Sequence, residues 1–253
     1  MPDDNALSPE VFDEVYAWIS DAPQTNKLFD QVLGPFPGGV EPFSLVPRAG
    51  LDRVFAELRL GAGDHLVDLC CGRGGIGLWF ASVSGARVTG IDFSPGAIAQ
   101  ASRRADAFVP RPQASFVVAD AADTSVPAKS AGAVVCIDAL QLVPDREGLL
   151  REAARVLRPG GRVVITTWER RGGEPADLPP EHSVAPLAGA AGLRILVHED
   201  CPDWLEQQRT FYEHVIAEDS DTAEPALRML AEEGRSLLPC WASVRRLLLV
   251  ASI

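Results

Sequence analysis

The stretch "VDLCCGRGGIG" (residues 67–77) decides the fold, because it joins a strand-like apolar run to four glycines within six residues. Glycine has no Cβ, so a turn of this composition lets the backbone come close to a bound ligand. The vicinal Cys70 and Cys71 raise a second question, about metal or redox chemistry. The chain has five cysteines and no zinc-type spacing, so packing explains the pair better and no metal site is expected.

Short apolar runs alternate with helical patterns after residue 64. The first five runs are "HLVDLC" (65–70), "ARVTGID" (86–92), "SFVVAD" (115–120), "AGAVVCID" (131–138) and "RVVITTW" (162–168). Runs that are apolar on both faces and separated by helices indicate a parallel sheet covered on both sides. Two later runs, 193–200 and 244–252, flank helices from about 202 to 235 and predict a closing strand pair. The expected fold class is α/β: a Rossmann-like, seven-stranded, doubly wound, mostly parallel sheet with an antiparallel C-terminal hairpin and an N-terminal helical cap.

The first 60 residues have helical patterns and precede the first strand. Ser8-Pro9-Glu10 is a helix start, with serine as the N-cap and proline in the first turn. The segment "GPFPGG" (34–39) then breaks the pattern. We expect residues 1–60 to form a cap and residues 61–253 to form the core. The pattern leaves open whether the cap is a mobile lid over the ligand site or a fixed helical layer, and whether Tyr16 and Trp18 face that site.

Charge and composition narrow the class of ligand. The 253 residues carry a formal net charge of −12 with no Lys/Arg cluster longer than a pair, so a small-molecule substrate is expected and no nucleic acid. No apolar run approaches the roughly 20 residues that span a bilayer. The acidic N-terminus lacks the basic and apolar regions of a signal peptide. We therefore expect a cytoplasmic protein with no membrane partner, and the oligomeric state stays open.

Four of the expected strands end in aspartate, at Asp68, Asp92, Asp120 and Asp138. The carboxyl ends of parallel strands lie at one edge of a sheet, where open α/β folds bind their ligands. Aspartate also favours turns and helix starts, which is enough to explain any one of these positions. The four together favour a polar ligand site at that edge.

The glycine turn also fits the dinucleotide fingerprint G-x-G-x-x-G, with Asp92 placed 20 residues after Gly72. An NAD(P)-dependent oxidoreductase is therefore one alternative. Asp68 weighs against it, because a carboxylate just before the turn suits a cationic ligand and repels a pyrophosphate. The closing strand pair weighs against it as well.

The chain resembles the class I S-adenosylmethionine-dependent methyltransferase family in five motifs, found in the family's order and spacing. They are "VDLCCGRGG", "VTGIDFSPGAI", "FVVADAADTSVP", "VVCIDALQLVPD" and "EAARVLRPGGRVVITTWE". Small-molecule methyltransferases, among them natural-product tailoring enzymes, look most similar. The methyltransferases that act on nucleic-acid amines carry Asn/Asp-Pro-Pro-aromatic after the fourth strand, where this chain reads Asp-Ala-Leu-Gln (138–141).

The resemblance implies S-adenosylmethionine as the cofactor and assigns residues to it. These are Asp68, Cys70, Gly72, Gly74, Asp92, Phe93, Asp120 and Ala121. The turn backbone is expected to pass close to the methionine moiety, with Asp68 organising the loop. Asp92 is expected to accept from both ribose hydroxyls, Phe93 to pack on the adenine and Asp120 to accept from its amine, beside the Ala121 backbone.

Three positions depart from the family's pattern. Cys70 replaces a common glycine, so the backbone there must accommodate a Cβ. Gly132 stands where an aspartate often precedes the fourth strand. Leu142 stands near the place at which many related small-molecule enzymes carry a histidine. The candidate catalytic residues are therefore Asp138, at the strand end nearest the sulfonium, and His182, at a loop-to-helix junction after the fifth strand.

The function that the resemblance implies is methyl transfer to a small acceptor, and the apolar cap segments favour an aromatic or lipophilic one. The acceptor atom stays open. Two further alternatives are a methyltransferase fold that catalyses a non-methylating reaction such as cyclisation, and a non-catalytic binding protein. The missing histidine keeps the cyclisation alternative open.

Overall fold

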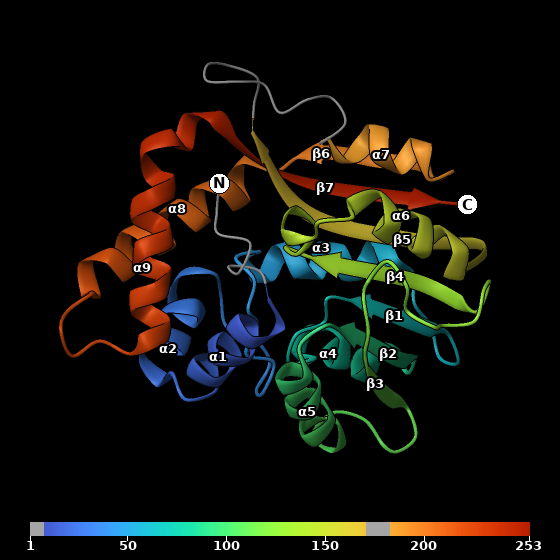
Figure 1. Ribbon diagram of the computed structural model, residues 1–253, viewed down its shortest axis with the longest axis horizontal. Coiled ribbons are helices and arrows are strands. Elements are labelled where there is room, and N and C mark those ends of the chain that lie inside the picture. The colour runs from blue at the N-terminus through green and yellow to red at the C-terminus, as the bar shows by residue number, and fades with distance from the viewer. Residues whose placement is uncertain (1–7, 171–182) are drawn as a thin grey trace.

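The computed structural model describes residues 8–170 and 183–253, and its centre is a seven-stranded sheet (Figure 1). The strands are β1 (His65–Leu69), β2 (Arg87–Asp92), β3 (Ala114–Val118), β4 (Ala131–Ile137), β5 (Leu157–Arg170), β6 (Arg194–Asp200) and β7 (Val244–Ser252). They lie in the order β3-β2-β1-β4-β5-β7-β6. Strands β1 to β5 pair in parallel, whereas β7 runs antiparallel to both β5 and β6. The mostly parallel sheet and its antiparallel closing pair are confirmed.

Helices and short 3-10 turns connect the strands. They are α1 (Pro9–Ser20), α2 (Pro23–Val32), α3 (Arg48–Leu58), α4 (Gly75–Ser84), α5 (Pro95–Arg104), η1 (Ala105–Ala107), η2 (Leu140–Leu142), α6 (Arg146–Val156), α7 (Val184–Ala190), α8 (Pro202–Glu218), α9 (Pro225–Leu237) and η4 (Leu238–Ser243). Ser8, Ser94 and Asp145 each accept a hydrogen bond from the backbone N–H three residues on, which caps α1, α5 and α6. The helix start predicted at Ser8 is confirmed.

Alternate residues of the inner strands face opposite sides of the sheet, so the core has two layers. On one face, Leu66, Ala133 and Val135 pack in a cluster with residues of α3 and α4. On the other face, Val67 and Val134 pack in a cluster with residues of α6 and α7. Helices cover both faces, which is why the central residues of these strands are mostly apolar on both sides.

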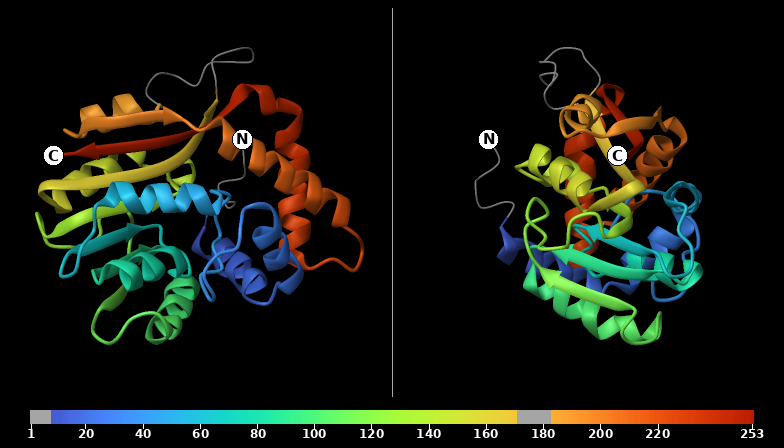
Figure 2. Two further views of the ribbon diagram at one scale, coloured as in Figure 1. Left: turned by 180° about the vertical axis from the view of Figure 1, so that it is seen from behind. Right: turned by 90° about the vertical axis from the view of Figure 1, so that its right-hand side faces the viewer.

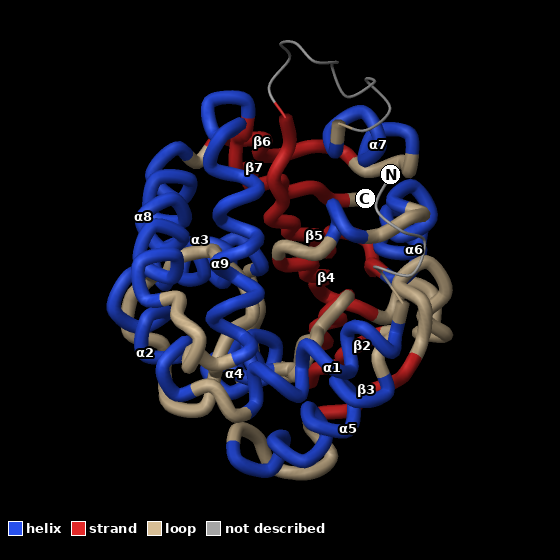
Figure 3. The backbone as a smooth tube through the Cα atoms, turned by 60° about the vertical axis from the view of Figure 1, so that its left-hand side comes forward, coloured by secondary structure: helices blue, strands red, loops and turns tan. Residues whose placement is uncertain are grey.

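A group of four helices lies beyond the carboxyl ends of the parallel strands. Helices α1 and α2 pack beside α8 and α9 there (Figures 1 and 2). The rings of Phe29 on α2 and Phe211 on α8 lie 4.6 Å apart between centroids, inside a shared apolar core. Figure 3 shows α8 and α9 on one side of the strands and α6 and α7 on the other. The cap is therefore built from segments far apart in the sequence.

The division into a cap of residues 1–60 and a core of residues 61–253 stays a prediction. The packing places α3, within that cap range, against the sheet, and places α8 and α9 with α1 and α2. One strand is shorter than predicted: β3 ends at Val118, so Asp120 lies beyond the strand in a bridge with Asp123. Across residues 8–170 and 183–253, no helix is long and apolar enough to cross a membrane.

Candidate active site

The glycine turn between β1 and α4 passes through backbone conformations that most side chains avoid. Cys70, Gly72 and Gly74 have φ angles of 58°, 52° and 74°, in the left-handed region. Cys70 is therefore strained at the position where the sequence departs from a common glycine. A Cβ at Gly72 would come within 2.8 Å of the Tyr16 hydroxyl oxygen, so the close approach of α1 to the turn requires glycine there.

Asp92, at the end of β2, is buried beside this turn. One carboxylate oxygen accepts a hydrogen bond from the Gly72 backbone N–H at 2.8 Å, and the other accepts from the Ser94 backbone N–H at 3.0 Å. Burial raises the pKa of Asp92, and these backbone donors partly oppose the increase. A carboxylate has about four lone-pair sites, so both oxygens retain acceptor capacity for a ligand.

Asp68 is the second buried acid of the turn. Burial, followed by the nearby charge of Asp92, raises its pKa to about 8, against a lowering effect of the Gly77 backbone N–H. A side chain at Gly77 would collide with the Asp68 carboxylate, which lies against the first turn of α4. Asp68 therefore holds its proton at neutral pH until a positive charge approaches.

The strand ends line a space of about 850 Å³, partly open to solvent, which we call the strand-end cavity. Its wall includes the predicted residues Cys70, Asp92, Phe93, Asp120, Ala121 and Asp138. Asp68, Cys70 and Gly72 also line an adjoining smaller space against the segment 41–44. Gly74 is the N-cap of α4 and borders neither space. The fold thus gathers the predicted residues from four strand ends around one connected region.

Aromatic side chains from the cap close this region on one side. Phe12 on α1 packs edge-on against Phe93 with 5.2 Å between ring centroids, and Tyr16 packs against Phe43 at 6.0 Å. Burial and the charge of Asp92 raise the pKa of Tyr16 well above its ordinary value. Trp18, by contrast, is exposed. The apolar face of α1 was visible in the sequence, but such a face does not distinguish a ligand contact from a core contact.

The segment before α3 clamps the glycine turn. Arg73, inside the turn, forms an ion pair with Glu41 at 2.6 Å between Nη2 and Oε2. Arg104 on α5 donates to the backbone carbonyls of Arg73 at 3.0 Å and Val40 at 3.1 Å. A side chain at Gly75 would collide with the Val40 carbonyl oxygen. The two segments therefore lie backbone against backbone.

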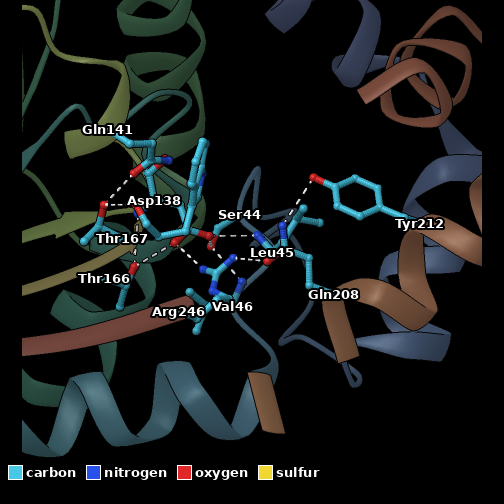
Figure 4. Close-up of polar contacts among 11 residues, drawn as sticks. Ser44, Leu45, Val46, Asp138, Gln141, Thr166, Thr167, Gln208, Tyr212 and Arg246 are labelled. Atoms are coloured by element: carbon cyan, nitrogen blue, oxygen red, sulfur yellow. Dashed lines mark hydrogen bonds and ion pairs between the residues drawn. The ribbon is translucent and has the colours of Figure 1, made fainter. Parts of the chain in front are cut away.

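Asp138 lies just beyond β4 with a φ of 52°, and four groups donate hydrogen bonds to its carboxylate (Figure 4). Oδ2 accepts from the Ser44 hydroxyl at 2.8 Å and the Leu45 backbone N–H at 3.0 Å. Oδ1 accepts from the Thr166 hydroxyl at 3.0 Å and from Nη2 of Arg246. Burial alone would raise the pKa of Asp138, but Arg246 and the hydroxyl donors hold it below its ordinary value. This geometry suits a positioning residue, and the catalytic role of Asp138 stays a prediction.

The second catalytic candidate, His182, lies outside the described residues, and its role stays a prediction. Two of the other histidines have local partners. His65 is half-buried with Nε2 2.8 Å from the Thr89 hydroxyl, and His214 approaches the Thr210 carbonyl within α8. Within the described parts of the chain, no group of three or more His, Cys, Asp or Glu residues has an arrangement that could hold a metal ion.

A second space lies between the sheet edge and the helices α1, α8 and α9. We call it the cap cavity; it contains about 1060 Å³, partly open to solvent. Its walls are largely apolar, with Trp168 from β5 and Met229 from α9 among them. Phe12, Phe43 and Leu142 line both cavities, as does Asp138. The two spaces therefore share a wall at the end of β4, where a group held in one can reach a group held in the other.

Comparison of the sequence with known proteins finds similarity to methyltransferases. A family model described as a methyltransferase domain matches residues 66–161. The 27-O-demethylrifamycin SV methyltransferase of Amycolatopsis mediterranei (strain S699) is 38% identical over 114 residues, which cover 45% of this chain and 42% of that protein. A 2-phytyl-1,4-naphtoquinone methyltransferase of Nostoc sp. is 33% identical over 156 residues, covering 58% and 66% respectively.

The likeness in structure extends over nearly the whole chain. The cyclopropane synthase MmaA2 of Mycobacterium tuberculosis matches with a TM-score of 0.72, covering 95% of this chain and 98% of that one. Its sequence identity is 16%, so the match concerns the fold. The chain spans about half the length of the first curated relatives that it matches in sequence.

Proposed function

The chain belongs to the class I methyltransferase family through its methyltransferase domain (residues 66–161), and on this premise we propose that it transfers a methyl group from S-adenosylmethionine to a small lipophilic acceptor. The family and fold predicted from the sequence are confirmed. The activity, the cofactor and the acceptor class are the proposal.

The observation that carries the proposal is the convergence of strand-end acids on one cavity. Asp92 retains acceptor sites for a pair of ribose hydroxyls, and Asp120 stands further along the same wall, next to Phe93 and Ala121. Asp68 is buried without a full counter-charge, as its raised pKa shows, so the turn favours a ligand that brings a cation. A sulfonium with an ammonium group fits these residues, whereas a pyrophosphate would add negative charge beside two buried acids.

When bound, S-adenosylmethionine supplies an electrophilic methyl group, and the protein supplies alignment and a dry site. Phe12 and Phe43 line both cavities and give their shared wall an apolar surface. The ion pair between Asp138 and Arg246 holds that wall in place, because Arg246 is buried and the Asp138 side chain is only 10% exposed. These residues hold the acceptor atom in line with the methyl group without taking a proton themselves.

One observation favours a second candidate function, a non-methylating reaction such as cyclisation on the same fold. Asp138 is saturated with donors, and Leu142 occupies the position at which many related enzymes carry a base. A reaction that needs no proton removal is compatible with this lining.

Calorimetry tests the cofactor first: we expect S-adenosylmethionine and S-adenosylhomocysteine to bind and NAD to give no heat. Incubation with S-adenosylmethionine and a panel of hydroxylated lipophilic compounds, read by mass spectrometry, then tests transfer. A methylated product supports the proposal, whereas a rearranged product of unchanged mass supports cyclisation. The absence of nucleic-acid partners and the cytoplasmic location stay predictions.

A further inference from the structure

The polar side chains of the cap cavity form one continuous chain of hydrogen bonds (Figure 4). Arg246 donates to Asp138 through Nη2 and to Oε1 of Gln208 through Nη1, the latter at 2.6 Å. Nε2 of Gln208 then donates to the Tyr212 hydroxyl oxygen at 3.3 Å. Glu233 on α9 lies near the Tyr212 hydroxyl, and its charge, after burial, raises the pKa of Tyr212. The chain of hydrogen bonds runs from the end of β4, across β7, to α8.

Arg246 determines which group donates and which accepts in each hydrogen bond of this chain. An arginine side chain has donors only, so the Gln208 oxygen that it contacts must accept and the Gln208 nitrogen must donate. Tyr212 receives that hydrogen bond on its oxygen, so its hydroxyl acts as an acceptor toward Gln208.

Glu233 is the acid of the cap cavity that a ligand can reach. Arg246 and Tyr212 have almost no exposed surface, and Gln208 is 3% exposed. Glu233 is exposed and lines the cap cavity beside largely apolar walls. A carboxylate only accepts hydrogen bonds when it is ionised, so at this wall Glu233 is suited to a ligand that donates one.

The charged residues that line the cap cavity disfavour an anionic ligand. Among the described residues that line the cap cavity, Arg246 is the one cation, and Asp138 and Gln208 engage both of its terminal nitrogens. Its remaining Nε has no hydrogen-bond partner but is buried away from the cavity surface. A phosphate or carboxylate on an acceptor would therefore lie near the acids Asp138 and Glu233 without direct access to an unpaired cation at the surface.

Building on the proposed function, we infer that Glu233 selects the acceptor: the cap cavity takes a lipophilic molecule whose polar group donates a hydrogen bond, a hydroxyl or an amine, and rejects anionic ones. The apolar walls bind the body of the molecule, and Glu233 binds its donor. Since Glu233 and Asp138 line the same cavity, an acceptor held by Glu233 is positioned relative to the wall that the two cavities share.

The test uses three probes with one ring system, with S-adenosylhomocysteine present at saturation. These are 2-naphthol, which donates a hydrogen bond, 2-methoxynaphthalene, which does not, and the anion 2-naphthoate. By calorimetry we expect 2-naphthol to bind the full chain about tenfold more tightly than 2-methoxynaphthalene, the value of a hydrogen bond to a charged group, and 2-naphthoate to bind least.

Three variants connect this preference to one side chain. Glu233→Leu is expected to bind 2-naphthol and 2-methoxynaphthalene equally, and Glu233→Gln to admit 2-naphthoate because the repelling charge is gone. Glu232→Gln, the neighbouring exposed glutamate outside the cavity lining, is the matched control and should keep the wild-type order. Thermal melts check that each variant is folded.

Equal binding of 2-naphthol and 2-methoxynaphthalene by the wild type, no binding of 2-naphthol, or an unchanged preference in both Glu233 variants would overturn the inference. Binding of S-adenosylhomocysteine is measured separately. If that compound binds and the probe order fails, the acceptor inference falls while the proposed function stands. If that compound does not bind, the proposed function itself falls.

Discussion

Asp138 and Arg246 form a buried ion pair between the end of β4 and the strand β7, across a sequence separation of 108 residues. The pair lies at the wall shared by the two cavities, and it links the segment 44–45 to the sheet through the other oxygen of Asp138. Two segments that enclose the candidate site are therefore fixed to one carboxylate.

We expect either Asp138→Asn or Arg246→Met to lower the free energy of unfolding by about 3–5 kcal/mol, because each change leaves a buried charge without its partner. The double variant should be more stable than the sum of the two losses predicts. Urea denaturation of the four proteins measures both quantities. Strictly additive losses would show that the two side chains do not interact, and an Asp138→Asn protein that is stable but inactive would favour a catalytic role for Asp138.

Asp68 should make the protein less stable as the pH rises. Its pKa is about 8 in the fold and close to 4 in the unfolded chain, so between these values the folded state binds more protons. The free energy of unfolding therefore falls from about pH 4 to about pH 8, and the contribution of Asp68 is lost over that window. Asp68→Asn should flatten this part of the stability–pH curve. Parallel curves for wild type and variant would contradict the raised pKa.

Asp92 should account for much of the cofactor affinity. We expect Asp92→Asn to weaken binding of S-adenosylhomocysteine at least about tenfold, since two hydrogen bonds to a charged group are worth about 1.5–3 kcal/mol each. Asp92→Ala should cost more, because the Gly72 backbone N–H also loses its acceptor. Calorimetry gives both affinities, with Asp106→Asn as a control at an exposed ion pair. An unchanged affinity in a folded Asp92→Asn protein would remove Asp92 from the site.

Gly75 should tolerate no side chain. We expect Gly75→Ala to push the Val40 carbonyl away, lower the free energy of unfolding by about 1–3 kcal/mol and weaken cofactor binding. Gly189→Ala is the matched control, because nothing lies within 4 Å of a Cβ at that position in α7. Thermal melts and calorimetry of the two variants test the difference. If both behave alike, the contact between the two segments does not hold the turn.

Amide exchange should show whether the cap acts as a lid, as the sequence left open. Helix α1 contributes Phe12 and Tyr16 to the strand-end cavity, so exchange in residues 9–20 should slow when S-adenosylhomocysteine binds. Helix α2 packs against α8 through Phe29 and should respond less. Exchange in α1 that ignores the ligand would support a fixed layer. This measurement is better than deleting residues 1–38, which would remove Phe29 from a packed core.

The strands and the gathering of the strand-end acids at one cavity were predictable because their signals are local. Apolar runs and terminal acids such as Asp92 lie within a few residues of each other, and a parallel sheet brings strand ends together by its geometry. Cys70 was also recognisable from the sequence as a departure from a common glycine. Its φ of 58°, in the left-handed region, explains why glycine is common at that position. The short β3 was missed because Val118 and Ala119 are both apolar, so composition does not mark where pairing stops.

The acceptor side was not predictable, because its partners are distant in sequence. Nothing near Asp138 indicates that Ser44 and Arg246 engage its carboxylate from either end of the chain. Tyr212 and Glu233 belong to helices whose apolar faces read as ordinary packing surfaces. Their joint role depends on how α8 and α9 lie against each other, which is tertiary information that helical periodicity does not contain.

Strand β7 follows every other strand in the sequence yet lies between β5 and β6, and it pairs with both. During synthesis on the ribosome, β6 therefore emerges well before the strand that connects it to the sheet. The parallel strands β1 to β5 with the glycine turn can assemble first, whereas β6 stays unpaired until α8 and α9 have been synthesised. Arg246 arrives with β7, so the wall between the two cavities forms last. A nascent chain can thus contain a complete cofactor half before it has any means of positioning an acceptor.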